Sequence, residues 1–523
     1  MSARAAAMSF ARAPGLLRRL QPLIAPAIIS VAAVAIWRLF FVGFIASDDG
    51  NYFAAAHGWL DHFPYVGVWW WDLRHTLTLP MALSMRLFGE SEVTLALPDL
   101  AYFIGIVLTA FYLVRREAGT LAAAIATSIL LTIAVLALAA STANVDLPEA
   151  FFVLLSVALF LAARHRDAHA TPLLLGAGAA AGLALLSRET TIALLIFYFI
   201  AYVAGFGIAR RRYWIMAIGF LAIAALDPLY FAIVAHDPLH RLHVALAGIG
   251  VNDRDHSVRF GIDNAGALRI HPLIDPILYL FTRPDFGIVF YLFVPAALWA
   301  ALRRRGAAPA VVTARMLALL AIVSVIFNAI VLRHNQILAR YDTVAVTAAA
   351  ITVAIWLVHR CLPRQPRLTA ALLVAAIAIN LVGIGTINRD PRWSERALVT
   401  YLASDRAAAV VTDPETVYRA RLFLAWAGDT ERVTARVPQP GDLYFYAQHN
   451  SAKATAQLPA ADLPLYRPRA DWTIAWQEQA GRSAIGALLE RLRLPSLLPA
   501  PLAAVLDRPP LSVTVYQVGS AMH

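Results

Sequence analysis

Long apolar runs recur along the chain and stop near residue 387. A transmembrane helix needs about 20 mostly apolar residues, and eleven runs reach or approach that length. The run at 214–235 contains Asp227-Pro228, which predicts a kink near its end because proline donates no backbone hydrogen bond. A further run at 274–281 is too short to span and predicts an interfacial helix. The eleven runs are 23–46, 97–114, 119–140, 147–163, 171–187, 190–209, 214–235, 285–302, 314–332, 341–359 and 368–387.

The tail of the chain, residues 388–523, has a different pattern. Helix-like stretches at 391–406, 414–426 and 483–493 alternate with strand-like stretches at 407–412, 443–446, 472–476 and 511–518. This alternation predicts a small α/β domain. The tail contains no Gly-rich phosphate loop and no metal-ligand spacing, so we expect it to act as a scaffold or to dock the acceptor.

Composition identifies the class of protein. Of the 523 residues, 60% are hydrophobic and only 15% are charged, whereas soluble proteins have roughly 25% charged residues. We therefore predict a polytopic α-helical membrane protein of about 11 transmembrane helices (residues 1–387) with a small C-terminal α/β extracytoplasmic domain (residues 388–523). The net charge of +11 comes largely from arginines between the apolar runs, which indicates topology and lipid contact and not nucleic-acid binding.

Arginine clusters set the expected orientation. They lie at 115–116, 164–166, 210–212, 303–305 and 360–367, all in connections on one side when the runs are threaded in order. The positive-inside rule then places that side in the cytoplasm. The outer loops 47–96 and 236–284 and the tail would lie on the periplasmic side of a bacterial inner membrane. Loop 47–96 is rich in tryptophan and is expected to lie along the membrane surface as amphipathic helices.

Two adjacent acids, Asp48 and Asp49, directly follow the first apolar run. At a membrane–water boundary, desolvation and mutual repulsion can raise the pKa of a carboxylate. Such a group can take a proton from a sugar or lipid hydroxyl. The alternative is a solvated helix end, and the position of the two acids does not decide between these interpretations.

Three motifs carry a resemblance to a known family. Asp48-Asp49-Gly50-Asn51-Tyr52 is followed by the stretches 56–59, 74–80 and 87–91; Asn144-Val145-Asp146-Leu147-Pro148 opens the fourth run; and Ala339-Arg340-Tyr341 opens the tenth. In order and spacing over residues 40–360, the chain resembles the C-type polytopic glycosyltransferases. The branch is the one that contains the dolichyl-phosphate-mannose–protein mannosyltransferases and the bacterial lipid A aminoarabinose transferases.

The resemblance implies a polyprenyl-phosphate-linked sugar donor, inversion at the anomeric carbon, and Asp48 or Asp49 as general base. It also assigns Tyr52, His75, Asp146, Arg188, Arg340 and Tyr341 to the substrate site. These assignments have alternatives: helix capping by Asn144 or Asp146 in place of a substrate role for Asp146, a local pair with Glu189 for Arg188, and a snorkelling arginine for Arg340. Cations at outer helix ends, which also include Arg333 and His334, suit the stabilisation of a departing phosphate.

The predicted function is thus transfer of one sugar to a hydroxyl of a glycan, lipid or protein acceptor. A lipid-linked glycan ligase or polymerase is the alternative enzyme, and a transporter or flippase is the alternative from another class. No cofactor is expected. We also expect no essential metal, although a divalent cation between His57 or His75 and His243 or His256 is a possibility left open by the residues.

Overall fold

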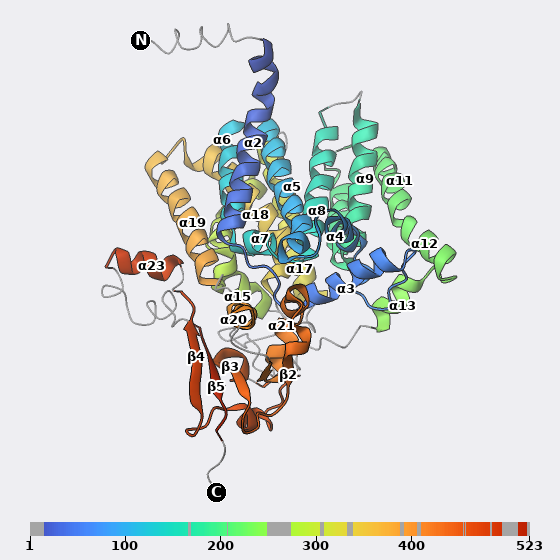
Figure 1. Cartoon of the computed structure of the whole chain (residues 1–523). Helices are drawn as coiled ribbons and strands as arrows, with labels where there is room; N and C mark the ends of the chain where they lie inside the picture. Colours follow the sequence, from blue (N-terminus) through green and yellow to red (C-terminus); the bar gives the residue numbers. More distant parts are fainter. Residues whose placement is uncertain are drawn as a thin grey trace.

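The structure is a computed structural model in which a helical bundle carries a small sheet domain at one end (Figure 1). It describes residues 15–165, 169–206, 208–247, 274–303, 308–331, 338–387, 392–404, 409–452, 454–455, 457–481, 484–493 and 511–519. The helices before the sheet domain are α2 (Gly15–Leu39), α3 (Asp48–Asp61), α4 (His75–Phe88), α5 (Glu92–Ala118), α6 (Thr120–Thr132), α7 (Ala134–Ala139), α8 (Asp146–Ala163), α9 (Ala170–Ser187), α10 (Ile192–Ala204), α11 (Tyr213–Ala224), α12 (Leu226–Val234), α13 (His240–Ala247), α15 (Asp275–Thr282), α16 (Val289–Leu302), α17 (Pro309–Val331), α18 (Thr343–Trp356) and α19 (Pro366–Ile387).

Within the described residues, seven helical segments are long and apolar enough to cross a membrane. Four shorter apolar stretches occupy the other four predicted positions, and one of them, Leu23–Leu39, is part of the 25-residue helix α2. The polytopic helical fold is therefore confirmed. The seven segments are Glu92–Ala118, Asp146–Ala163, Ala170–Ser187, Arg210–Val234, Pro309–Ile330, Ala339–Cys361 and Pro366–Ile387, and the four shorter ones are Leu23–Leu39, Thr120–Thr132, Glu189–Ala204 and Val289–Leu302.

Two of the runs are interrupted. The run 119–140 is split into α6 and α7 at Ile133, whose backbone is extended (φ −65°, ψ 121°), and no glycine or proline marks this break. The run 214–235 is divided into α11 and α12 at Ala225. Pro228, in the first turn of α12, donates no hydrogen bond to the preceding turn, which accounts for this break. The kink predicted from Asp227-Pro228 is therefore confirmed.

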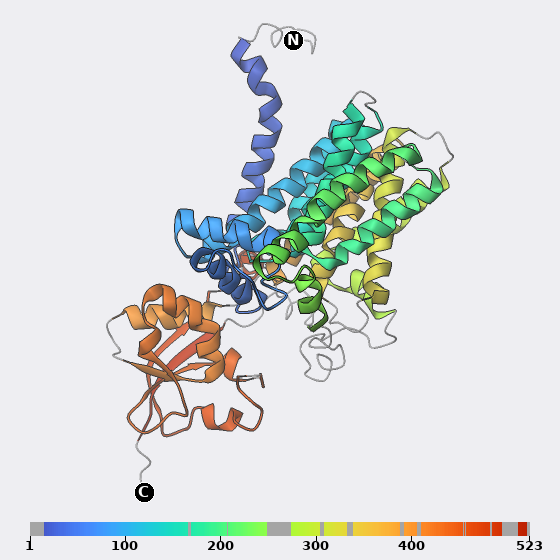
Figure 2. The same cartoon turned by 90° about the vertical axis from the view of Figure 1, so that its right-hand side faces the viewer.

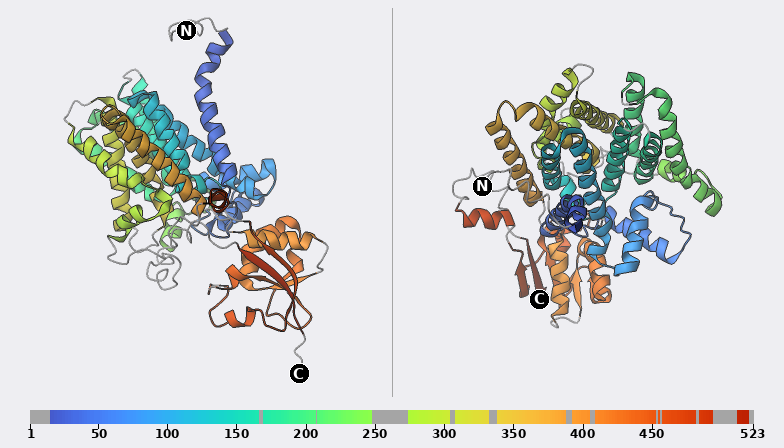
Figure 3. Two further views of the ribbon diagram at one scale, coloured as in Figure 1. Left: turned by 90° about the vertical axis from the view of Figure 1, so that its left-hand side faces the viewer. Right: turned by 90° about the horizontal axis from the view of Figure 1, so that it is seen from above.

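The ends of the bundle differ in character. At one end the last turns of α5, α8 and α18 meet, where Glu117 contacts Arg116 and His165 at 2.8 and 3.1 Å and His359 lies 3.0 Å from the carbonyl of Ala118. At the other end α3, α8 and α18 begin. In two views at right angles to Figure 1, α2 stands apart from the bundle over its first half (Figures 2 and 3).

The tail forms the predicted α/β domain. Its five strands run in the order β2-β1-β3-β5-β4, with β1 parallel to β2 and β3, and β5 antiparallel to β3 and β4. Helices α20 and α21 cover one face, where Leu398, Leu424 and Phe445 are buried. Strand β2 was not predicted. The elements are α20 (Trp393–Ala403), β1 (Val410–Thr412), α21 (Pro414–Ala427), β2 (Val433–Ala435), β3 (Leu443–Ala447), α22 (Gln448–Ser451), β4 (Thr473–Gln479), α23 (Ala484–Arg491) and β5 (Ser512–Gln517).

Helices α20 and α21 also form the junction with the bundle (Figure 1). The ring of Phe44 lies edge-on to Phe423 and Trp426 of α21, with centroids 5.7 and 6.3 Å apart. Arginines of and before α20 bond to the segment 42–45, which leads from α2 into α3. The sheet domain therefore lies directly against the segment that carries Asp48 and Asp49.

Candidate active site

Five side chains from four distant segments meet at the end of the bundle next to the sheet domain. Asp48 opens α3, Asp146 opens α8, Arg188 follows α9, and Arg340 and Tyr341 lie in the 3₁₀ turn Ala339–Asp342 before α18. All five were predicted from the sequence as site residues. The structure brings them together because these helices begin or end at the same level of the bundle.

Asp48 is paired with a residue 292 positions away. Nη2 of Arg340 donates to Oδ2 of Asp48 at 2.6 Å. The two side chains are 27% and 30% exposed, so water and a substrate can reach them. Asp48 also lies in the first turn of α3, where the partial positive charge of a helix N-terminus favours a carboxylate.

Asp49 has a different environment from its neighbour. Its carboxylate is buried and accepts backbone N–H groups from Ile45 at 2.5 Å, Ser47 at 2.6 Å and Gly50 at 3.1 Å. Burial raises the pKa of Asp49, and the three N–H donors oppose that rise. Both carboxylate oxygens are thus engaged in holding the turn that begins α3.

Arg188 and Arg340 both contact Asp146 and Tyr341. The guanidinium of Arg188 bonds to Oδ1 of Asp146, and Nε of Arg340 lies 3.9 Å from Oδ2 of the same carboxylate. The guanidinium carbons lie 4.3 Å (Arg188) and 5.8 Å (Arg340) from the ring centre of Tyr341. Two cations are therefore held close together by one buried acid and one aromatic ring.

Asp146 is itself fixed by its neighbours. Its backbone N–H donates to Oδ1 of Asn144 at 2.7 Å, and the N–H of Asn144 donates to the fully buried Asp99 at 3.0 Å. The cap residue of α8 is Val145, which makes no side-chain cap bond. The carboxylate of Asp146 pairs with an arginine and does not cap the helix, whereas the side chain of Asn144 accepts the N–H of the first residue of α8.

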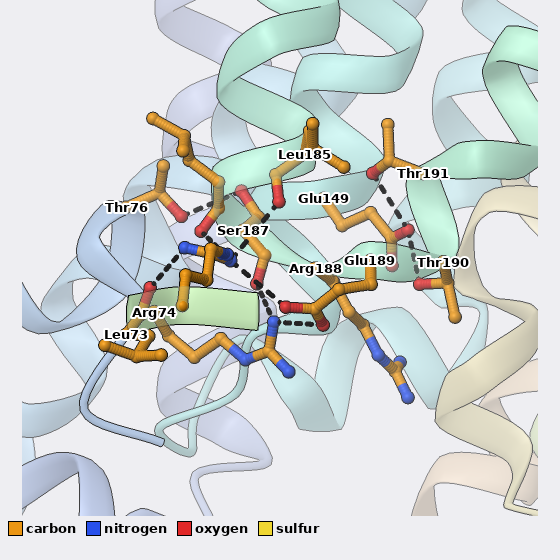
Figure 4. Close-up of polar contacts among 12 residues, drawn as sticks. Leu73, Arg74, Thr76, Glu149, Leu185, Ser187, Arg188, Glu189, Thr190 and Thr191 are labelled. Carbon is orange, nitrogen blue, oxygen red and sulfur yellow. Dashed lines mark hydrogen bonds and ion pairs between the residues drawn. The ribbon is translucent and has the colours of Figure 1, made fainter. Parts of the chain in front are cut away.

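In the turn after α9, successive side chains contact different parts of the bundle (Figure 4). Arg188 points away from Arg74, while Glu189 accepts from Nη1 of Arg74 at 2.5 Å and from Nη2 of Arg241 at 3.3 Å. The local Arg188–Glu189 pair considered above is not the pairing observed. Two more acceptor bonds fix the turn on its far side, where Thr190 and Thr191 donate to the buried Glu149 at 2.6 and 3.2 Å.

His75 lies in the cluster around Arg241 and not in the cluster around Asp48 and Arg340. Its Nδ1 lies 3.3 Å from Oδ1 of Asp227, which Arg241 also contacts at 3.3 Å. The rings of Trp59 and Phe231 lie 5.5 and 5.9 Å from the imidazole ring. Sequence reasoning placed His75 in the substrate site but gave no partner for it.

Tyr52 lies four residues after Asp48, on the same face of α3, and its side chain is buried. Burial raises the pKa of the phenol, so Tyr52 is a neutral hydrogen-bonding group there.

Several residues considered from the sequence contribute differently or lie elsewhere. His57 contacts Glu90 at 3.1 Å and His243 contacts Asp237 at 2.9 Å, and among the described residues no three His, Cys, Asp or Glu side chains form a metal-binding group. The metal prediction stays a prediction. Arg333, His334 and His256 lie outside the described residues.

Arg74, Glu189, Asp227 and Arg241 were not predicted as site residues. Arg74 and Glu189 adjoin the predicted His75 and Arg188, so opposite charges beside predicted site residues were an available signal. Arg241 lies in a polar loop with several other charges, and nothing in the sequence singles it out.

Comparison with known proteins gives one family match. Residues 78–233 match the sequence model of the family described as dolichyl-phosphate-mannose-protein mannosyltransferase. No curated protein matches the chain in sequence. The matched range begins within α4, three residues after His75, contains Asp146 and Arg188, and ends before Arg340.

Solved structures share the fold. ArnT from Cupriavidus metallidurans is 14% identical, with 94% of this chain and 97% of that chain covered and a TM-score of 0.53. Its form bound to undecaprenyl phosphate matches with 14% identity, coverage of 94% and 98% and a TM-score of 0.52. The oligosaccharyltransferase AglB from Archaeoglobus fulgidus, in complex with an inhibitory peptide and a dolichol-phosphate, matches with 15% identity and a TM-score of 0.50.

The lengths of these proteins differ. The match with the archaeal enzyme covers 80% of this chain but only 65% of the oligosaccharyltransferase, whereas ArnT is covered almost completely. The predicted resemblance is confirmed by the family match and by the shared fold. Residues 78–233 are similar to the dolichyl-phosphate-mannose-protein mannosyltransferase family, and the chain shares the fold of the solved ArnT and AglB structures.

Proposed function

We propose that this enzyme transfers one sugar from a polyprenyl-phosphate carrier to a hydroxyl group of a glycan, lipid or protein, with inversion. The observation that carries the proposal is the contact of Asp48 with Arg340 beside Arg188 and Tyr341. It combines an accessible carboxylate with two cations at one end of an apolar bundle. A reaction between a hydroxyl and a phosphate-linked sugar needs these groups.

The donor phosphate would bind at Arg188 and Arg340. A guanidinium can hold two phosphate oxygens at once, and Asp146 and Tyr341 keep these two guanidinium groups oriented. The bound undecaprenyl phosphate of the similar ArnT supports a polyprenyl phosphate as the carrier. The apolar bundle next to the site suits a polyprenyl chain.

Asp48 would act as the general base. The acceptor oxygen attacks the anomeric carbon, its proton passes to the Asp48 carboxylate, and the bond from that carbon to the phosphate oxygen breaks. The released polyprenyl phosphate keeps the electron pair, and its charge is stabilised by Arg188 and Arg340. A single displacement of this kind inverts the anomeric configuration.

Asp49 then has a positioning role, and Tyr52 and His75 would contact the sugar or the acceptor. Tyr52 adjoins Asp48 and offers a neutral hydroxyl, and His75 is oriented by Asp227.

We further propose that the enzyme resides in a bacterial inner membrane with this site facing the periplasm. The opposite, arginine-bearing end of the bundle supports that orientation.

The test uses purified enzyme in vesicles, a panel of undecaprenyl-phosphate hexoses and pentoses with radiolabelled sugar, and extracted envelope lipids and glycans as acceptors. We expect Asp48→Asn to lower turnover by about 10²–10⁴-fold while undecaprenyl-phosphate binding stays close to parental. Arg340→Met should weaken that binding instead. Asp61→Asn, the same change at an exposed acid of α3, is the matched control.

Parental turnover in Asp48→Asn would remove Asp48 as the base. Absence of transfer from every member of the panel, with undecaprenyl phosphate not bound, would refute the polyprenyl-phosphate donor.

A further inference from the structure

Arg392, which precedes α20 of the sheet domain, bonds to the segment that carries Asp48. Its Nε donates to the carbonyl of Ile45 at 2.9 Å, and its Nη2 donates to the same oxygen. The N–H of Ile45 in turn donates to Asp49. A continuous path of hydrogen bonds therefore runs from Arg392 through Ile45 and Asp49 to the first turn of α3.

The guanidinium of Arg392 is anchored inside the sheet domain. Its side chain is 10% exposed, and Nη1 lies 3.4 Å from Oε1 of the fully buried Glu395. Nδ2 of Asn450 donates to the same Glu395 oxygen at 3.1 Å and lies 3.3 Å from Oγ1 of Thr416. Arg392 is thus the outer member of a buried polar network of this domain and is held on both sides.

A second arginine, Arg396, bonds to the same segment three residues before Ile45, at Val42. Its Nη2 donates to the carbonyl of Val42 at 3.0 Å and to Oε1 of Glu92 at 2.7 Å. Glu92 also accepts from the N–H of Phe44 at 2.9 Å. A Cβ on Gly43 would lie 2.2 Å from Glu92, so the segment leaves no room between these groups.

We propose that Arg392 is a positioning residue that holds the Asp48 carboxylate in reactive geometry from the sheet domain. The role of this domain is then to complete the active site and not only to dock an acceptor. The inference rests on the proposed function, since it concerns the base of that reaction. It goes beyond that proposal by assigning catalytic geometry to a residue outside the helical bundle.

The chemistry gives the expected size of the effect. Displacement of a reacting group by about 1 Å can lower a rate about 10²-fold. Loss of the Arg392 contact frees the Ile45 carbonyl and loosens the turn, while Arg188 and Arg340 keep their own contacts with Asp146. We therefore expect kcat to fall by about 10–100-fold in Arg392→Met, with the KM for the undecaprenyl-phosphate sugar changed by less than about threefold.

The matched control is Arg436→Met. Arg436 forms a bidentate pair with Asp442 at 2.7 Å for both bonds, within the same domain and without a contact to the segment 42–50 among the described residues. The Arg436→Met variant should keep kcat within about twofold of the parental value. Arg392→Lys should recover only part of the rate, because an ammonium lacks the rigid planar fork whose Nε and Nη2 share the Ile45 carbonyl.

A double-mutant cycle separates positioning from general support of the fold. If Arg392 acts through Asp48, Arg392→Met should change the residual rate of Asp48→Asn by less than about threefold, although it lowers the parental rate by more than about tenfold. Undecaprenyl-phosphate binding by each variant reports that the bundle is folded.

Equal fold losses in the two backgrounds, or equal losses in Arg392→Met and Arg436→Met, would overturn the positioning role while leaving Asp48 as the base. Parental activity in Asp48→Asn would overturn the base itself, and this proposal with it. If Arg392→Met does not insert, Arg392→Lys carries the cycle with the same criteria.

Discussion

Asp48 and Asp49 are neighbours in the chain but occupy different environments. Asp48 projects towards Arg340 and is partly exposed, whereas Asp49 turns inward and accepts three backbone N–H groups. At a solvated helix end, water molecules would donate to the Asp49 carboxylate in place of these three N–H groups. We therefore expect loss of Asp48 to affect turnover and loss of Asp49 to affect stability.

At the residue scale we predict that Asp49→Ala lowers the free energy of unfolding by about 1–3 kcal/mol, because three backbone N–H groups lose a buried carboxylate acceptor. Asp48→Ala, at a partly exposed carboxylate, should cost less. Unfolding of the detergent-purified enzyme, followed by tryptophan fluorescence, measures both. An equal loss in the two variants would contradict the assignment of Asp49 to structure.

At the scale of elements, α9 and α11 touch through their backbones. A Cβ on Gly178 would lie 1.9 Å from the carbonyl oxygen of Met216, and one on Gly219 would lie 2.2 Å from that of Leu175. Small residues at a crossing allow membrane helices to approach closely. Helix α9 ends at Ser187, so this contact also sets the place of Arg188.

We predict that Gly178→Ala lowers stability by at least about 1–3 kcal/mol, because neither backbone can yield to the added methyl group. The matched control on the same helix is Gly176→Ala, whose Cβ would meet only the flexible end of Leu159 at 3.3 Å. Thermal unfolding in detergent and undecaprenyl-phosphate binding are the measurements. Gly178→Ala should impair both, and a result equal to that of Gly176→Ala would refute the close contact.

At the scale of the whole molecule, the sheet domain and the proposed site share one end of the bundle (Figure 1). The last turns of α5, α8 and α18 form the other end, close to Cys361. A membrane around the bundle would therefore separate the site from the native cysteine.

We predict opposite labelling of these ends by an impermeant maleimide applied to intact spheroplasts. Asp61→Cys on α3 and Thr473→Cys on β4, each in a Cys361→Ser background, should react from outside. Cys361 of the parent should react only after permeabilisation. Labelling of Thr473→Cys from the same side as Cys361 would show that the threading of the chain is wrong.

Much of the fold follows from local pattern. Hydrophobic runs of membrane length predicted the helical positions because lipid requires every spanning backbone group to bond within its own helix. Alternating stretches predicted α20, α21, α23, β1, β3, β4 and β5. The sequence did not reveal β2, which is only three residues long, or the break at Ile133, where no residue type signals an end.

The sequence by itself determined the class of protein, the location of most helices and the chemical types at the site, because these depend on hydropathy and on residues close in the chain. Only the tertiary structure decided which acid of the pair faces the arginines, that Arg188 pairs with Asp146 and not with Glu189, and that Arg392 reaches Ile45. These contacts join residues 42 to 347 positions apart. They depend on how helix ends and the sheet domain pack, and no local pattern encodes that packing.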